Sequence, residues 1–205
     1  FYKQVQPRSV LEAIYKDLGD AIEKKYGRAF TPMQATAYKA IREKHFYSFS
    51  APTSTGKSYL FRELVKDYDK DIVIVVPSRA LIAEFYSVVI DLVQNDVLVL
   101  QFIENVNQHN TSRRIFIITP ERGTEIFKYS GDFDVGIFLF DEAQISEEPV
   151  RGLSFDAFVR RTEREFPNAT KVFAHPFVSN PKAQFTKHGF VENYQADSFK
   201  QSNVG

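Results

Sequence analysis

The chain has 205 residues, a length for one domain or slightly more at about 150 residues per domain. Hydrophobic residues make up 43% of it and aromatic residues 15%, so it can bury a core, which excludes a disordered or fibrous protein. Its 26 basic residues balance 26 acidic ones, so no overall field draws it to a polyanion or to an anionic membrane surface. Any contact with nucleic acid must therefore be local.

The lack of cysteine and of long apolar segments narrows the class of protein further. The chain contains no cysteine, which excludes a disulfide framework, a thiolate zinc site, an iron–sulfur cluster and a cysteine nucleophile. The most apolar runs, 72–76 and 115–118, are far shorter than the roughly 20 residues that span a bilayer, and no signal peptide opens the chain. We therefore expect a cytoplasmic protein without membrane contact. Because the chain runs from Phe1 to Gly205 without a signal that closes the fold, we expect it to be a piece of a longer protein.

The N-terminal segment predicts two helices. Ser9 precedes Glu12 by three residues, and apolar residues then recur at a spacing of four up to Gly27, a pattern typical of a capped amphipathic helix. Thr31, followed by a proline, is the expected cap of a second helix that runs to about Lys44.

Beyond these helices, short apolar runs alternate with helical stretches. Several of the runs are continuous rather than alternating, which is typical of strands buried on both faces of a parallel sheet. The pattern predicts an α/β fold with a doubly wound, mostly parallel sheet and helices on both faces. The polar segment 104–114 is the expected long surface loop. Strands are expected at residues 46–50, 72–76, 97–102, 115–118, 135–140 and 171–174, and helices at 57–68, 80–93, 121–129 and 155–166.

A candidate phosphate-binding loop lies between a predicted strand and a predicted helix, in the segment Ala51-Pro52-Thr53-Ser54-Thr55-Gly56-Lys57-Ser58. Backbone amides at the helix start form an anion site, Lys57 adds a point charge for the β- and γ-phosphates, and the Ser58 hydroxyl can hold magnesium. Ala51 stands where the usual pattern has its first glycine. The alternative is a Gly-Lys-Ser turn without function.

Two neighbouring carboxylates, Asp141 and Glu142, follow the apolar strand ending at residue 140 and precede Gln144. They emerge at the carboxyl edge of the sheet, where the phosphate loop also opens. Asp141 can hold magnesium through its water shell, and Glu142 can orient or deprotonate the attacking water. On its own, such a pair is more often a helix N-cap. Together with the loop, it favours a nucleotide site.

With these motifs in this order, the chain resembles the first RecA-like motor domain of a superfamily-2 helicase. Gln34, in Thr31-Pro32-Met33-Gln34, resembles the glutamine with which that family reads adenine, because an amide can pair with adenine N6 and N7. The resemblance implies that ATP is the nucleotide, with magnesium. Without the loop, Gln34 would equally be a solvent-facing helix residue.

Two further strand-to-helix junctions follow the family's order. Pro77-Ser78-Arg79-Ala80-Leu81-Ile82-Ala83-Glu84 resembles motif Ia, and Thr119-Pro120-Glu121-Arg122 resembles motif Ib. The resemblance implies that Ser78, Arg79, Thr119 and Arg122 grip the sugar-phosphate backbone of single-stranded or duplex DNA or RNA, without reading its sequence. Either junction alone could be an ordinary capped helix start. The motif style is most similar to Ski2-like and Hel308-like members.

The chain departs from the family at two positions that are coupled there. Gln144 stands where motif II usually ends in Asp or His, and Ala174-His175-Pro176 stands where motif III is commonly Ser-Ala-Thr. We hypothesise that a hydrogen bond from Gln144 to His175 replaces the usual link, since an amide and an imidazole can each donate and accept. The alternative for His175 is a strand-end histidine held by local packing.

The resemblance makes residues 1–180 a RecA-like ATP-binding domain that includes the N-terminal helix. Residues 181–205 would then be the last helix and the approach to a second RecA-like domain of a longer chain. The catalytic residues would be Lys57, Asp141, Glu142 and Gln144. No stretch matches the second domain's arginine finger, so this piece should hydrolyse ATP slowly. Two alternatives remain open: a P-loop kinase of a small molecule, and a non-catalytic interaction module that kept the fold.

Overall fold

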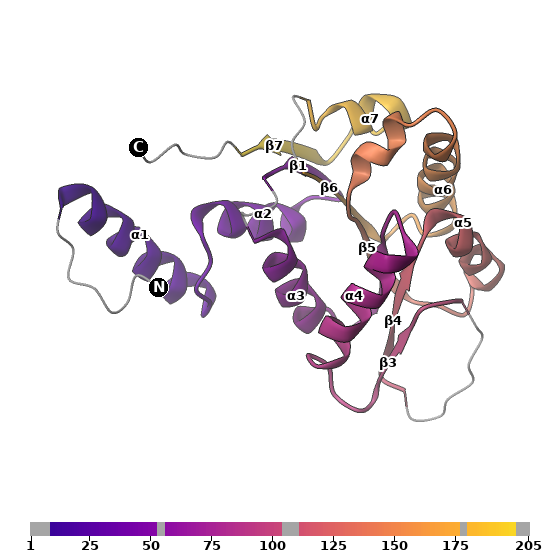
Figure 1. Cartoon of the computed structure of the whole chain (residues 1–205), viewed down its shortest axis with the longest axis horizontal. Helices are drawn as coiled ribbons and strands as arrows, with labels where there is room; N and C mark the ends of the chain where they lie inside the picture. Colours follow the sequence, from indigo (N-terminus) through magenta and orange to yellow (C-terminus); the bar gives the residue numbers. More distant parts are fainter. Residues whose placement is uncertain (1–8, 53–55, 104–110, 177–179, 200–205) are drawn as a thin grey trace.

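The computed structural model describes residues 9–52, 56–103, 111–176 and 180–199. Within these residues, seven parallel strands form one sheet in the order β3-β4-β2-β5-β6-β1-β7, with helices on both sides (Figure 1). This confirms the predicted doubly wound, parallel α/β fold. The strands are β1 (Phe46–Ser50), β2 (Asp71–Val75), β3 (Val97–Leu100), β4 (Arg113–Ile118), β5 (Val135–Phe140), β6 (Thr170–His175) and β7 (Tyr194–Ser198).

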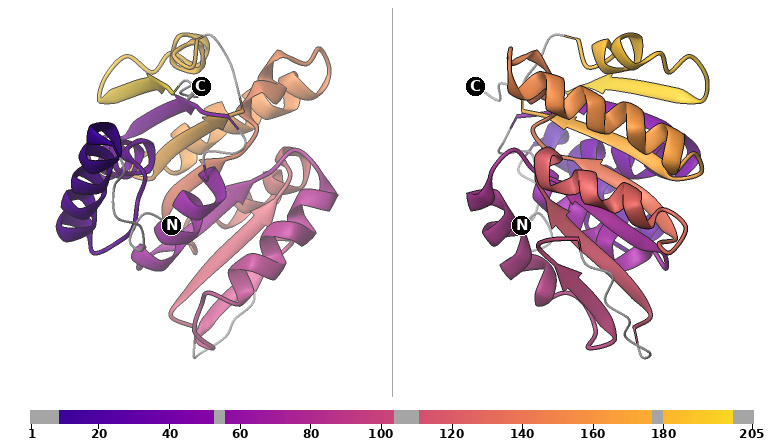
Figure 2. Two further views of the ribbon diagram at one scale, coloured as in Figure 1. Left: turned by 60° about the vertical axis from the view of Figure 1, so that its left-hand side comes forward. Right: turned by 90° about the vertical axis from the view of Figure 1, so that its right-hand side faces the viewer.

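The helices divide between the two faces of the sheet (Figure 2). Side chains at alternate positions of β2 explain why: Ile72 and Ile74 join the core beneath α2, α3 and α4, whereas Val73 and Val75 join the core formed with the segment 124–129, α6 and α7. A continuous apolar run is therefore what a strand with two covered faces requires. The helices are α1 (Val10–Tyr26), α2 (Pro32–Glu43), α3 (Lys57–Asp67), α4 (Arg79–Ile90), α5 (Pro120–Gly123), α6 (Arg151–Glu165) and α7 (Ala183–His188), with 3-10 helices η3 (Thr124–Tyr129) and η4 (Ala143–Glu147).

The prediction of one continuous α-helix at 121–129 is wrong, because the segment contains two kinds of helix. The segment forms one α-helical turn, α5, and continues as the 3-10 helix η3. Gly123 lies at the change, where a Cβ atom would approach a Phe158 ring carbon to 2.7 Å and the Ile118 Cδ1 atom to 2.6 Å. The missing side chain lets this segment pack directly against α6.

The C-terminal part contains a strand that the apolar pattern did not predict. β7 pairs in parallel with β1 and so becomes an edge of the sheet, after the short helix α7. The strand Tyr194–Ser198 is polar and only partly buried, and for that reason it carries no apolar run. Residues 104–110 of the expected surface loop lie outside the described residues. None of the helices in the described ranges is long and apolar enough to cross a membrane.

A buried polar cluster joins η4, α6 and α7. The Ser146 hydroxyl donates to the Asp156 carboxylate at 2.8 Å, and Lys187 pairs with the same carboxylate at 2.6 Å. His188, whose side chain is fully buried, lies 3.2 Å through its Nε2 atom from the Gln184 side-chain oxygen. Gln184 donates its amide to the carbonyl of Ala143 at 3.2 Å. The cluster therefore fixes η4 from both neighbouring helices.

Protonation of His188 is expected to destabilise the fold at acidic pH. Burial lowers the pKa of its imidazole to about 4, with Asp156 acting in the opposite direction. Because the folded-state pKa lies below the unfolded value, the unfolded chain binds the proton first, and stability falls as the pH drops from about 6.5 towards 4. We expect His188 to contribute a loss of about 2 kcal/mol in the free energy of unfolding between pH 6.5 and 5.

Urea unfolding of the wild type and of His188→Gln at these two pH values measures this contribution. The variant should show a shallower pH dependence, although not a flat one, because burial also lowers the pKa of His175 to about 4. An identical pH dependence in the two proteins would contradict the assignment.

Candidate functional site

Five strand ends bring the candidate residues to one edge of the sheet. In a parallel sheet all carboxyl ends lie on the same side, and here β4, β2, β5, β6 and β1 are consecutive neighbours. Thr119 follows β4, Pro77 lies just beyond β2, Asp141 follows β5, His175 ends β6 and Ala51 follows β1. The four predicted motifs and the phosphate loop therefore line one edge, in the order Ib, Ia, II, III and loop.

Backbone hydrogen bonds hold these neighbouring ends in register. The Asp141 amide donates to the Val75 carbonyl at 2.9 Å, and the Ala51 amide donates to the His175 carbonyl at 3.1 Å. Motif II is thereby fixed beside the end of β2, and the phosphate loop beside the end of motif III.

Gly56 shapes the described end of the predicted phosphate loop. Gly56 adopts a left-handed conformation with φ of 80° and directly precedes α3. A Cβ atom at this position would lie 2.3 Å from the Gln34 side-chain nitrogen, and together with the positive φ this favours glycine. Ser58 lies exposed on the first turn of α3. Thr53, Ser54 and Thr55 fall outside the described residues.

Lys57 carries a buried charge without a partner. The residue is 7% exposed, and its Nζ atom makes no hydrogen bond with any of the residues described. An unpaired buried ammonium is strongly unfavourable, so its environment favours an anionic ligand. The amide-rich start of α3 lies beside it. The residues present therefore fit the phosphates of a nucleotide.

Asp141 and Glu142 occupy the position expected of a metal and water site. Burial raises the pKa of the Asp141 carboxyl to about 6, the charge of Lys57 lowers it, and Glu142 raises it further. A divalent cation would relieve this carboxylate of its unfavourable environment. Glu142 itself adopts a left-handed backbone conformation with φ of 54°, a strained geometry for a residue with a side chain.

Gln34 is buried and both ends of its amide are engaged. Its oxygen accepts from the Thr31 amide at 2.9 Å, which completes a capping box at the start of α2. Its nitrogen donates to the Gly56 carbonyl at 3.0 Å. The glutamine is therefore not a solvent-facing helix residue: it ties α2 to the phosphate loop.

The hypothesised direct hydrogen bond between Gln144 and His175 is not present. The Gln144 nitrogen donates to Glu142, and the Nε2 atom of His175 bonds Ser48 Oγ at 3.2 Å. Since the Ser48 hydroxyl donates to the Pro181 carbonyl at 2.7 Å, the imidazole must be the donor to Ser48. This leaves the Nδ1 atom of His175 and the Oε1 atom of Gln144 as buried acceptors that have no partner within the described part of the chain, and two acceptors cannot bond each other.

Ser48 is a site residue that sequence reasoning missed. It lies on β1 and contacts His175 on the adjacent strand β6. β1 has serine at two of its five positions, Ser48 and Ser50, and nothing in the sequence marks either of them for such a contact. Burial, with a smaller contribution from the charge of Lys57, lowers the pKa of His175 to about 4, so the imidazole is neutral at physiological pH.

The two remaining junctions lie side by side at the ends of β2 and β4. Ser78 caps α4, accepting from the Leu81 amide at 3.4 Å, and Arg79 is exposed on the first turn. Thr119 precedes α5 but is only 6% exposed, whereas Arg122 is exposed. Two basic side chains on adjacent strand ends thus face solvent at the same edge as Lys57 and Asp141.

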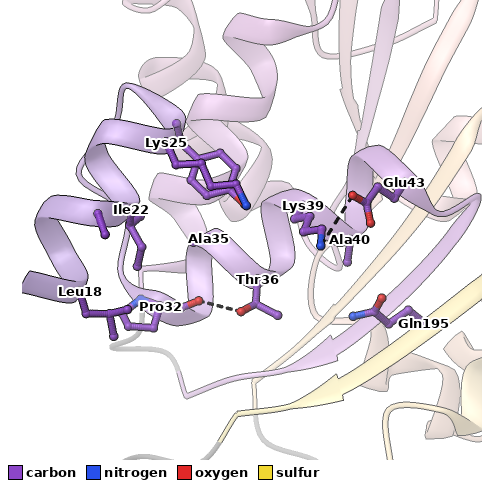
Figure 3. A pocket seen from close by; sticks show the side chains of 12 residues that line it. Leu18, Ile22, Lys25, Pro32, Ala35, Thr36, Lys39, Ala40, Glu43 and Gln195 are labelled. Carbon is purple, nitrogen blue, oxygen red and sulfur yellow. Dashed lines mark hydrogen bonds and ion pairs between the residues drawn. The ribbon is translucent and has the colours of Figure 1, made fainter. Parts of the chain in front are cut away.

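A cavity of about 490 Å³ lies away from this edge, between α1 and α2 (Figure 3). Its lining is mostly apolar and includes Leu18 and Ile22 of α1 and Ala35 of α2, with Gln195 of β7 at one side. The polar groups there are engaged locally: Thr36 donates to the Pro32 carbonyl at 2.9 Å. None of the candidate site residues lines it.

Comparisons with known proteins agree with this geometry. No curated protein sequence matches the chain. Two solved structures share the fold: a hypothetical ATP-dependent RNA helicase from Sulfolobus tokodaii, at 18% identity and a TM-score of 0.59, and the Hef helicase domain of Pyrococcus furiosus, at 16% and 0.61. The matches cover 88% and 89% of this chain but only 56% and 41% of those chains, so this chain spans about half of their length. The sequence profile of the DEAD/DEAH box helicase family matches residues 31–175, and the chain therefore belongs to that family.

Proposed function

We propose that this chain is the ATP-binding motor domain of an ATP-dependent DNA or RNA helicase or translocase, which hydrolyses ATP with magnesium when joined to a second RecA-like domain. Membership of the DEAD/DEAH box helicase family supports ATP binding and argues against a small-molecule kinase. The motif style further favours a Ski2-like or Hel308-like member. We place its action in the cytoplasm as part of the same proposal.

One observation carries the proposal. Lys57 is buried at the start of α3 with no hydrogen-bond partner among the described residues, and its charge lowers the pKa of both Asp141 and His175. The ammonium therefore lies within electrostatic reach of motifs II and III at once. A residue needed only for packing would not carry a positive charge at this buried position.

Each residue of the edge has a task in this proposal. The residues of the phosphate loop, Thr53 to Ser58, would cradle the phosphates, with Lys57 neutralising their charge. Ser58 and Asp141 would hold magnesium, Asp141 partly through water, and the metal when bound neutralises charge on the phosphoryl oxygens. Glu142 would orient and deprotonate the attacking water. Its strained backbone fits such a role, since strain is retained where function requires a fixed carboxylate.

Coupling between nucleotide and strand is part of the proposal. The two unpartnered acceptors, Gln144 Oε1 and His175 Nδ1, would both be satisfied by a donor between them, such as one water molecule. η4, which contains Gln144, packs against β6, which ends in His175. A bridging donor would thus restore the link that the direct bond does not supply.

Base preference tests the adenine assignment of Gln34. Wild type should bind Mg·ADP more tightly than Mg·GDP in a calorimetric titration, and Gln34→Ala should lose that preference. Because Gln34 also caps α2, the matched variant is Gln34→Glu, which keeps an oxygen for the Thr31 amide and loses the amide donor. If Gln34→Ala lowered the affinity for both nucleotides equally, Gln34 would act only through its hydrogen bond to Gly56.

Strand binding should depend on salt and on two arginines. If three phosphates are contacted, single-strand affinity should fall by about 10- to 30-fold between about 50 and 200 mM salt. Arg79→Ala and Arg122→Ala should each weaken binding uniformly across sequences and lower the logarithmic salt slope by about 0.7. Arg164→Ala, an exposed arginine near the far end of α6, serves as the control. A changed sequence preference in either variant would overturn the backbone-only assignment.

A further inference from the structure

Arg151 provides a side-chain link between two junctions of the sheet edge, in addition to the backbone hydrogen bond from Asp141 to Val75. It is the first residue of α6, directly after the loop that follows η4. Its guanidinium donates to the carbonyl of Pro77, just beyond the end of β2, and pairs with Glu148 at 3.3 Å. Pro77 immediately precedes Ser78 and Arg79, the proposed strand grip. One side chain thus reaches from the motif II side to motif Ia.

The base of Arg151 is held firmly. Gly152 passes so close to η4 that a Cβ atom would lie 2.6 Å from the Ser146 carbonyl oxygen, which is backbone and cannot give way. The Gly152 amide donates to the Glu148 carbonyl at 2.9 Å. Ser146 is itself fixed, since its hydroxyl bonds Asp156 and its carbonyl accepts from Lys187 at 2.7 Å. Movement of η4 must therefore carry Arg151 with it.

The other end of η4 begins inside motif II. Ala143 is the third residue of the motif and the first of η4, and its carbonyl accepts from Gln184 of α7 at 3.2 Å. η4 itself joins Ala143 to Ser146, the close approach of Gly152 joins Ser146 to the start of α6, and Arg151 joins α6 to Pro77.

We propose that Arg151 is a positioning residue that holds the β2–α4 junction against the segment after motif II, so that the strand grip at Ser78 and Arg79 depends on it. This inference rests on the proposed function. Arginine suits the task because its planar fork reaches Pro77 and Glu148 together, which a lysine ammonium at the end of a flexible stem cannot reproduce.

Two substitutions separate this role from direct contact with a phosphate. If Arg151 acts by positioning, Arg151→Gln and Arg151→Lys should both lower single-strand affinity about tenfold and leave the salt slope unchanged. A direct phosphate contact would instead leave Arg151→Lys near wild type and lower the slope of Arg151→Gln by about 0.7. Arg164→Gln, at the other end of the same helix, is the matched control. Mg·ADP affinity without strand should stay within about twofold, whereas a general loss of structure would lower it too.

Hydrogen exchange tests the positioning role without nucleic acid. The amides of Leu81 and Ile82 bond to Ser78, so they report the first turn of α4. We expect Arg151→Gln and Arg151→Lys to speed their exchange about tenfold or more, with Arg164→Gln unchanged. Unchanged exchange in the Arg151 variants would overturn the inference. Failure of the wild type to bind any strand would overturn the proposed function, while the exchange result would still decide whether Arg151 holds the junction.

Discussion

Lys57→Ala is expected to lower the affinity for Mg·ADP by about 100-fold or more. Hydrogen bonds to a charged donor contribute about 1.5–3 kcal/mol each, and the ammonium can offer more than one to the phosphates. In this structure the Nζ atom is buried with no partner within the described residues, so none of that capacity is used elsewhere. Calorimetric titration of Mg·ADP into wild type and variant measures the loss.

Thermal unfolding provides the control for this prediction. Removing a buried unpaired charge should leave the ligand-free melting temperature unchanged or higher, while the rise on adding Mg·ADP disappears. Lys66→Ala is the matched variant, because Lys66 lies on the same helix and is partly exposed, and its partner Glu63 at 2.7 Å keeps a second ion pair with Arg28 at 3.0 Å. It should keep the full nucleotide-induced rise. A rise of wild-type size in Lys57→Ala would contradict the role given to this residue.

The sheet and the placement of the site were predictable because each depends on local sequence. β2 and β5 are continuous apolar runs, and such runs in an α/β pattern lead to a parallel sheet whose carboxyl ends share one edge. Asp141 directly follows β5, and the loop that leads to Lys57 follows β1, so their meeting at that edge needs no knowledge of side-chain packing. The family order of the motifs then points to the same edge.

Other features depend on contacts between distant segments and left no local signal. β7 is a partly buried polar strand whose place is decided by pairing with β1, not by its own composition. The bond from Gln34 to the Gly56 carbonyl, and the partnering of His175 with Ser48, arise from side-chain directions on separate elements. From the sequence alone, Arg151 is indistinguishable from an ordinary surface charge at the start of a helix. Pairwise geometry of this kind follows from the packed fold alone.

Glu142→Gln is expected to slow ATP hydrolysis and to leave nucleotide binding nearly unchanged. The substitution keeps the size of the side chain and an oxygen that can accept from Gln144, but it removes the carboxylate. A general base contributes about 100- to 10,000-fold to a rate, so turnover should fall by about 1000-fold while Mg·ATP affinity stays within about threefold. Glu147→Gln, the same chemical change on an exposed residue at the end of η4, should alter neither.

The measurement uses single-turnover hydrolysis in the form of the protein that carries the proposed second domain, because the isolated chain should hydrolyse slowly. Glu142 holds a backbone conformation that costs on the order of 1 kcal/mol, and such strain is often found at functional sites. A turnover within tenfold of wild type in Glu142→Gln would move the base to another group. Nucleotide binding with no turnover even in the wild type would instead favour an interaction module that retains the fold, with Gln144 and His175 as the positions where catalysis was lost.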